Sequence, residues 1–323
     1  MTHPEPTDRA GAEAWFLAHG LPYFVDPIRE QVRHRLSRGR LTLVASGALL
    51  VAVPVGVAVG WRSSDVSAGI SIGVTLLLLV AALYAGRALR VHLIGRWALR
   101  QTLSSLGLLF PLATRALPML LLFVTFLFIN AEVWQVSSRQ DGAALWLVAL
   151  LFGVLAVLFL LVRLPEEVDR TDDQVDDALL LLACRGTPLE DAARDLVDDP
   201  GADPAARAEI HGFERWNLVL VLLVIQAVQV LLLSATVFLF FMLFGSMVMR
   251  DDVVETWIGE PTANLTVELF QVSIFLAAFS GLYLTVATVT DETYREQFFG
   301  TVLHEMERAV GIRAVYLALR ERG

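Results

Sequence analysis

Seven polar side chains interrupt apolar segments that are long enough to cross a membrane. They are Asn130, Glu132, Gln135, Gln226, Gln229, Ser280 and Tyr283. A polar group surrounded by lipid is costly, so such residues either serve a function or fasten one helix to another. Gln226 and Gln229 are three residues apart and therefore share one helix face. We expect these seven residues to include any functional site within the membrane.

Two interpretations of these residues are open. In the first, they line a path for a cation or another small solute. Glu132 would lie just below the outer surface, where further acidic residues would concentrate cations. Those residues are Asp251, Asp252, Glu255, Glu260 and Glu268. In the second, hydrogen bonds between the fifth and sixth apolar segments only join two helices.

The sequence shows no arrangement of residues typical of catalysis or metal binding. One cysteine and six histidines without ligand spacing argue against a metal or iron-sulfur site. The chain has no lysine and hence no phosphate-binding loop of the Gly-Lys-Ser type. His304 and Glu305 lack the second histidine of a zinc-protease helix. We therefore expect no enzymatic activity, no cofactor, no metal and no nucleic-acid partner.

The composition is that of an integral membrane protein. Of the 323 residues, 56% are hydrophobic and only 18% charged, and the mean hydropathy is +0.61. Segments of about 20 apolar residues can cross a bilayer as helices. We predict an all-α fold with six such helices, at residues 41–61, 67–86, 116–136, 144–162, 217–249 and 268–290. The fifth is unusually long and must tilt, bend or project beyond the lipid.

The arginines predict the orientation of these helices. Basic residues are retained on the cytoplasmic side, and only Arg62, Arg139 and Arg250 of the 25 arginines fall on the opposite side if the N-terminus is cytoplasmic. Both termini should then be cytoplasmic. Because every basic residue is arginine, we infer a GC-rich bacterial gene and expect the protein in a bacterial inner membrane. Cys184 lies in a predicted cytoplasmic loop, where an impermeant thiol reagent would test this orientation.

Three segments are predicted outside the lipid: residues 1–40, 165–216 and 291–323. They flank membrane regions at residues 41–164 and 217–290. The loop at 165–216 contains 15 acidic residues and five arginines, which accounts for the net charge of −9. The C-terminal segment has the pattern of an amphipathic helix, whose apolar residues are Phe298, Phe299, Val302, Leu303, Met306 and Val310. The acidic loop, the N-terminal segment, a second copy of the chain or another protein could cover them.

Three runs resemble a group of actinobacterial multi-pass membrane proteins that have no assigned function. The runs are FINAEVWQV (128–136), RWNLVLVLLVIQAVQVLL (215–232) and AAFSGLYLTVATVTDETYREQFF (277–299). The resemblance implies a shared membrane fold and carries over no binding or catalytic residue. On the residues alone, we expect a protein of the lipid bilayer that moves a small solute or cation. The alternative is a structural or regulatory protein that binds a cytoplasmic or membrane partner, or a second copy, through its loop and C-terminal helix.

Overall fold

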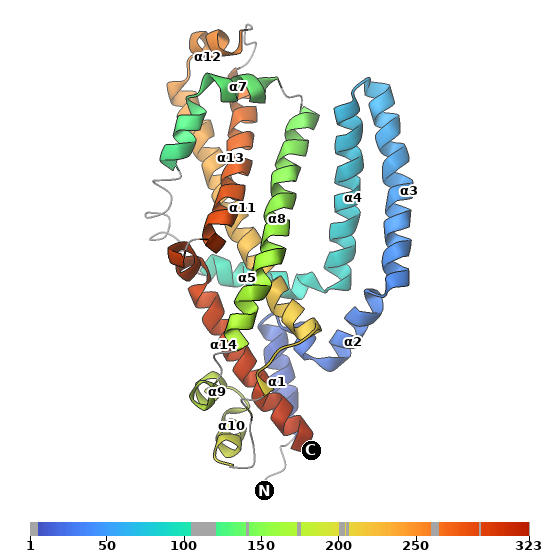
Figure 1. Cartoon of the computed structure of the whole chain (residues 1–323), viewed down its shortest axis with the longest axis vertical. Helices are drawn as coiled ribbons and strands as arrows, with labels where there is room; N and C mark the ends of the chain where they lie inside the picture. The colour runs from blue at the N-terminus through green and yellow to red at the C-terminus, as the bar shows by residue number, and fades with distance from the viewer. Residues whose placement is uncertain are drawn as a thin grey trace.

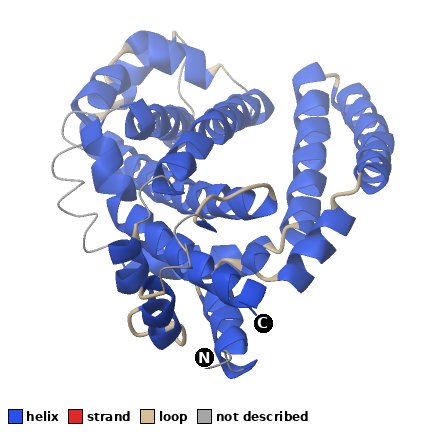
Figure 2. Ribbon diagram, turned by 60° about the horizontal axis from the view of Figure 1, so that its bottom comes forward, coloured by secondary structure: helices blue, strands red, loops and turns tan. Residues whose placement is uncertain are grey.

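The computed structural model describes residues 6–104, 121–139, 142–172, 176–199, 204, 207–259, 265–290 and 292–322. Almost all of them are helical, and these residues include no strand (Figure 2). The predicted all-α class is confirmed. Both chain ends lie at one end of the elongated molecule, here named the terminal end, and α7 and α12 lie at the other, the far end (Figure 1).

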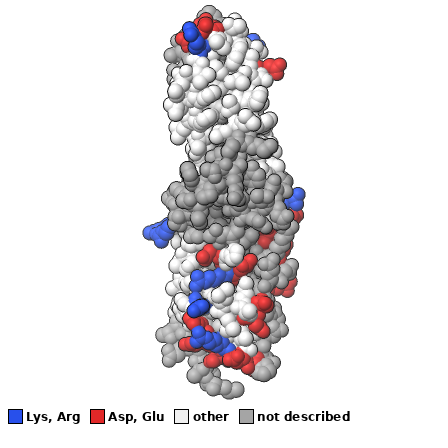
Figure 3. All heavy atoms as spheres, turned by 90° about the vertical axis from the view of Figure 1, so that its left-hand side faces the viewer, with Lys and Arg blue, Asp and Glu red and all other residues white. Residues whose placement is uncertain are grey.

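Five helices in the described residues are long and apolar enough to cross a membrane. They are α3 (Arg38–Ser63), α4 (Val66–Ala88), α8 (Gly142–Asp172), α11 (Phe213–Val248) and α13 (Leu265–Thr290). The predicted segments 41–61, 67–86, 144–162 and 268–290 lie within α3, α4, α8 and α13. Charged side chains gather at the far tip and on the terminal half, and the surface just beneath the tip is mostly uncharged (Figure 3). The chain is therefore an integral membrane protein.

The third predicted segment has a different shape. Residues 116–120 lie outside the described residues, and the chain then forms a helix at Leu121–Phe128. After Ile129 and Asn130 it continues as α7 (Ala131–Ser138), at an angle of 71° to the helix before it. These two helices together could supply a sixth crossing only as a broken span.

Helices α3 and α4 form a hairpin whose contact is made by glycines. Asp65 caps α4 by accepting hydrogen bonds from the backbone N–H groups of Ser67 and Ala68. A Cβ at Gly69 would lie only 2.6 Å from the carbonyl oxygen of Gly56. Small residues thus allow the two backbones to approach. The hairpin stands to one side of the other membrane helices and contacts them mainly through α4 and α8 (Figure 1).

Helices α8, α11 and α13 pack together as the centre of the membrane region. The unusual length of the fifth predicted segment is explained by α11, which continues unbroken for 36 residues and extends past the lipid-facing region into the terminal end. A Cβ at Gly281 of α13 would lie 2.5 Å from Ser234 Oγ, and one at Gly245 of α11 would lie 2.2 Å from Leu269 Cδ1. These contacts fix an antiparallel register between α11 and α13.

A helical domain, here named the terminal domain, is built from segments far apart in the sequence. It comprises α1 (Pro6–Ala18), the 3₁₀ turn η1 (Pro22–Phe24), α2 (Asp26–Arg35), α5 (Val91–Ser104), α9 (Asp177–Cys184), α10 (Glu190–Val197) and α14 (Glu292–Arg322), with the adjoining parts of α8 and α11. Their apolar side chains form one core, in which Phe16, Tyr23, Leu180, Leu218 and Val310 are buried. Met306 and Val310 of the C-terminal helix are covered, and α9 of the acidic loop packs on this helix.

Candidate functional site

The polar residues of α11 and α13 are buried. Gln226 and Ser280 have no exposed surface, and Gln229 retains 9%. The Ser280 hydroxyl donates to the carbonyl oxygen of Leu276 at 2.7 Å, one turn earlier in its own helix. Because this donor is already used, Ser280 does not supply a hydrogen bond to a glutamine on α11.

Gln229 carries a buried side-chain carbonyl. Gln229 Oε1 is inaccessible and has no hydrogen-bond donor within the described part of the chain. Gln229 directly precedes Val230 on α11, and a Cβ at Gly281 of α13 would lie 3.2 Å from Val230 Cγ1. Ser273, nearer the far end of α13, is also fully buried, and its Oγ likewise has no partner among the described residues. A buried carbonyl without a donor lowers the stability of the fold by about 1–3 kcal/mol. A polar species bound at Gln229 would remove this cost.

Asn130, Glu132 and Gln135 lie at the far end, away from the glutamines. Asn130 caps α7, because its Oδ1 accepts the backbone N–H of Glu132 at 2.8 Å. Glu132 is exposed rather than enclosed in a straight helix, since the chain turns through 71° just before it. Gln135 Nε2 donates to the carbonyl oxygen of Trp257 at 2.7 Å and so links α7 to α12 (Asp251–Ile258). These three residues shape the end of the bundle.

An aromatic layer separates the two polar groups. The Phe128 ring stacks on that of Phe241, with centroids 4.7 Å apart, and also contacts Phe244 and Trp134. Phe128, Trp134 and Phe241 are fully buried. Phe241 lies 12 residues beyond Gln229 on α11, hence about 18 Å nearer the far end. The layer therefore lies between the glutamines and the far end of α11.

The other predicted residues have separate positions. Tyr283 is 44% exposed and stacks on Phe123, so it lies at the periphery of the bundle. Asp251, Asp252 and Glu255 are exposed on α12. Glu268 is partly buried at the start of α13, and its Oε2 has no partner within the described residues. Glu260 lies outside the described residues. The acidic side chains near the far end therefore occur on α7, α12 and α13.

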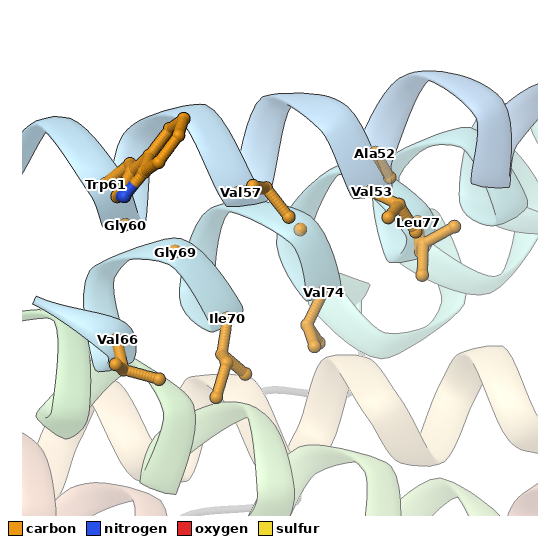
Figure 4. Close-up of a pocket in the computed structure, with 12 residues that line it drawn as sticks. Ala52, Val53, Val57, Gly60, Trp61, Val66, Gly69, Ile70, Val74 and Leu77 are labelled. Carbon is orange, nitrogen blue, oxygen red and sulfur yellow. The ribbon is translucent and has the colours of Figure 1, made fainter.

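A groove lies on the α3–α4 hairpin (Figure 4). It has a volume of about 560 Å³, and Val57, Gly60, Gly69 and Ile70 are among the residues that line it. No charged side chain lines it. The run from Gly69 to Gly73 has the Gly-x-Ser-x-Gly spacing of a hydrolase nucleophile turn, but it lies inside a helix. These glycines serve contact between helices.

Sequence reasoning missed a charged cluster in the terminal domain. Glu214 and Arg313 form an ion pair in which each side chain is 9% exposed, and Arg313 Nε lies 2.9 Å from Glu214 Oε2. Arg29 pairs with the other oxygen of Glu214. Asn217, one turn after Glu214, accepts the backbone N–H of Tyr23 at 2.7 Å and donates to the carbonyl oxygen of Gly20 at 3.0 Å. The sequence signal that could have indicated this cluster is the pair of polar residues Glu214 and Asn217 at the start of an apolar run.

Burial also perturbs titrating groups of this domain. The pKa of the Cys184 thiol is raised to about 12, chiefly because the side chain is removed from water. Desolvation likewise raises the pKa of Tyr23 and, together with a hydrogen bond to Glu13, that of Tyr316. These groups remain neutral at physiological pH and serve packing and hydrogen bonding.

Comparisons with protein-family models, with curated proteins and with solved structures find no match to this chain. The likeness to actinobacterial membrane proteins stays a prediction.

Proposed function

We propose that the protein moves a small solute, above all a small cation, across a membrane without chemistry of its own. The observation that supports this is the buried carbonyl oxygen of Gln229, which has no donor in the described structure. Carbonyl oxygens replace the hydration shell of cations in membrane pores. Gln229 is therefore the residue on which the proposal depends, with Gln226 on the same helix as its neighbour.

The arrangement along α11 suggests how such a path would be controlled. Exposed acids at the far end, including Glu132 and Asp252, would raise the local cation concentration. The stacked rings of Phe128 and Phe241 would form a hydrophobic constriction between that end and Gln229. Phe128 ends the helix before the bend at Asn130, so a movement of this broken segment would separate the two rings. The described conformation is then a closed one.

Cation flux into proteoliposomes tests this proposal. The purified chain is reconstituted and uptake of K⁺ is followed beside that of two variants, Gln229→Leu and Phe241→Ala. We expect Gln229→Leu to lose flux and Phe241→Ala to gain it. Thr236→Val is the matched control, because Thr236 lies on the same helix, is exposed, and donates its hydroxyl to the carbonyl oxygen of Leu232 in its own helix.

Two results would contradict the proposal. One is equal flux in Gln229→Leu and in the unchanged chain. The other is flux no greater than that of protein-free vesicles in both the unchanged chain and Phe241→Ala, since the variant removes the constriction.

The proposed location is a bacterial cell membrane, with the terminal domain in the cytoplasm. Because Cys184 is fully buried, it is a poor reporter of orientation. A cysteine at Asp191, whose side chain is 97% exposed on α10, is a better one when Cys184 is replaced by Ala. An impermeant maleimide should label it only after lysis, and labelling of intact cells would reverse the orientation.

A second function is favoured by a different observation. On α9, Leu182 is 67% exposed and Leu181 37% exposed, although this helix belongs to the terminal domain and not to the lipid-facing bundle. Such apolar exposure suits a docked partner, which would make the protein structural or regulatory. Crosslinking from a photoreactive residue at Leu182 in living cells should then capture one partner. Equal capture from Asp191 would argue against a specific site.

A further inference from the structure

Three helix ends are tied together where the α3–α4 hairpin meets the terminal domain. Arg35, the last residue of α2, donates from its guanidinium to the carbonyl oxygen of Arg87 at 2.8 Å. The Tyr84 hydroxyl donates to the carbonyl oxygen of Arg35 at 2.5 Å. Arg90, between α4 and α5, donates to Gln31 Oε1 of α2. Arg40 at the start of α3 contacts His34 of α2, so the ends of α2 and α4 and the start of α3 form one surface.

This surface is densely basic. Arg35, Arg38, Arg40 and Arg87 are exposed, and Arg90 is partly so. We name these five residues the arginine elbow. Within the described residues, none of them has a carboxylate within ion-pairing distance. The side chain of Arg40 instead lies 3.2 Å from His34 Nε2.

Several other arginines of the terminal end do have acidic partners. Arg163, Arg194, Arg207, Arg215 and Arg320 each pair with an acidic residue. The chain carries nine more acidic than basic residues, so anionic partners are plentiful. Within the described part of the chain the elbow therefore gathers five arginines without a carboxylate partner, and an anion from outside the chain would neutralise them.

The elbow lies at the level where lipid headgroups would be. Only 11% of the most apolar part of α3 and of α4 is buried inside the molecule, so both helices expose their apolar surfaces to the bilayer. Arg38 and Arg40 begin α3, and Arg87 lies in the last turn of α4. The start of α3 and the end of α4 both lie on the side of the terminal domain (Figure 1).

We propose that the arginine elbow binds the phosphate groups of anionic phospholipids in the adjoining leaflet. Guanidinium groups form paired, charge-assisted hydrogen bonds with phosphate oxygens. Basic residues next to a membrane helix attract anionic lipids. The acyl chains of the same lipids would lie along the apolar surfaces of α3 and α4. This continuity of a basic edge with a lipid-facing surface favours a lipid over an acidic protein.

Native mass spectrometry of the detergent-solubilised chain tests the proposal. Phosphatidylglycerol and phosphatidylcholine are titrated, and the bound lipid is counted. We expect a preference for phosphatidylglycerol that weakens by about fivefold for each elbow arginine replaced by Gln, and hence by about 25-fold in Arg38→Gln/Arg40→Gln. This double variant leaves the hydrogen bonds of Arg35 and Arg90 intact. A second variant adds Arg35→Gln and Arg87→Gln.

The control variant removes the same charge from paired arginines. Arg163→Gln/Arg194→Gln should keep the lipid preference, although its net charge equals that of the elbow double variant. Inorganic phosphate at equal concentration should not displace the lipid. Equal loss in the two double variants would reduce the effect to net charge and overturn the site. An unchanged lipid preference in both elbow variants would also overturn the site. Displacement of the lipid by inorganic phosphate would show that the site binds a free anion instead of a lipid.

Discussion

The buried pair between Glu214 and Arg313 gives the sharpest prediction for stability. Arg313→Met keeps an unbranched apolar side chain and removes the charged guanidinium group. The variant leaves a carboxylate in a site where only 9% of the side chain is exposed. It also removes the donors to the backbone carbonyls of Arg207 and Glu209. Breaking one side of a buried ion pair costs about 3–5 kcal/mol, and we expect about 3 because Arg29 still contacts Glu214.

The assay uses the buried thiol of the same domain. Cys184 becomes reactive to a pulse of maleimide when the terminal domain unfolds, so a urea titration of the detergent-solubilised chain yields the free energy of unfolding. The expected change of about 3 kcal/mol corresponds to about a 150-fold larger unfolded fraction. The matched control is Arg320→Met, whose exposed pair with Asp26 should contribute less than about 1 kcal/mol.

Two outcomes would refute this reasoning. One is a loss in Arg313→Met no larger than that in Arg320→Met. The other concerns Glu214→Met/Arg313→Met, which removes both charges and should be more stable than the single variant. If the double variant is the less stable one, the cost does not arise from an uncompensated charge.

Three further predictions concern other parts of the chain. Gly69→Ala should destabilise the α3–α4 hairpin, since its Cβ would lie 2.6 Å from the carbonyl oxygen of Gly56. Gly47→Ala should not, because its Cβ would meet no neighbouring atom within 4 Å. Thermal unfolding of the two variants measures the difference. Asn130→Ala should lower stability by about 0.5–2 kcal/mol through loss of the α7 cap, again measured by thermal unfolding. Burial raises the pKa of Cys184 from 9.0 to about 12, so the stability contributed by its neutral thiol is complete below pH 9 and is lost toward pH 12. Over that interval the melting temperature should fall less in Cys184→Ala than in the unchanged chain.

Hydropathy was enough to predict the all-α class, because the backbone N–H and C=O groups of a segment in lipid must form hydrogen bonds within that segment. That requirement makes long apolar runs helical, as in α3 and α4. Hydropathy does not, however, show where the axis of a helix changes direction. The apolar run from Leu121 continues to Val133 except at Thr125, Asn130 and Glu132, so its hydropathy gives no sign of the 71° bend. The signal was Asn130 itself, a residue type that prefers the helix N-cap. If Asn130 is taken as a helix N-cap, the sequence predicts Glu132 at the surface and not in the lipid.

The ion pairs of the terminal domain could not be predicted from local sequence patterns, because they join residues far apart in the chain. Glu214 meets Arg313 across 99 residues and Arg29 across 185, and each of these residues alone has the character of an exposed charge. Only the packing of α1, α2, α14 and the extended α11 removes them from water together. The arginines of the elbow are the counterpart: within the described residues no carboxylate pairs with them, and four of the five are exposed. A buried ion cluster and a basic membrane edge therefore arise from one set of similar arginines, distinguished by which helix each of them meets.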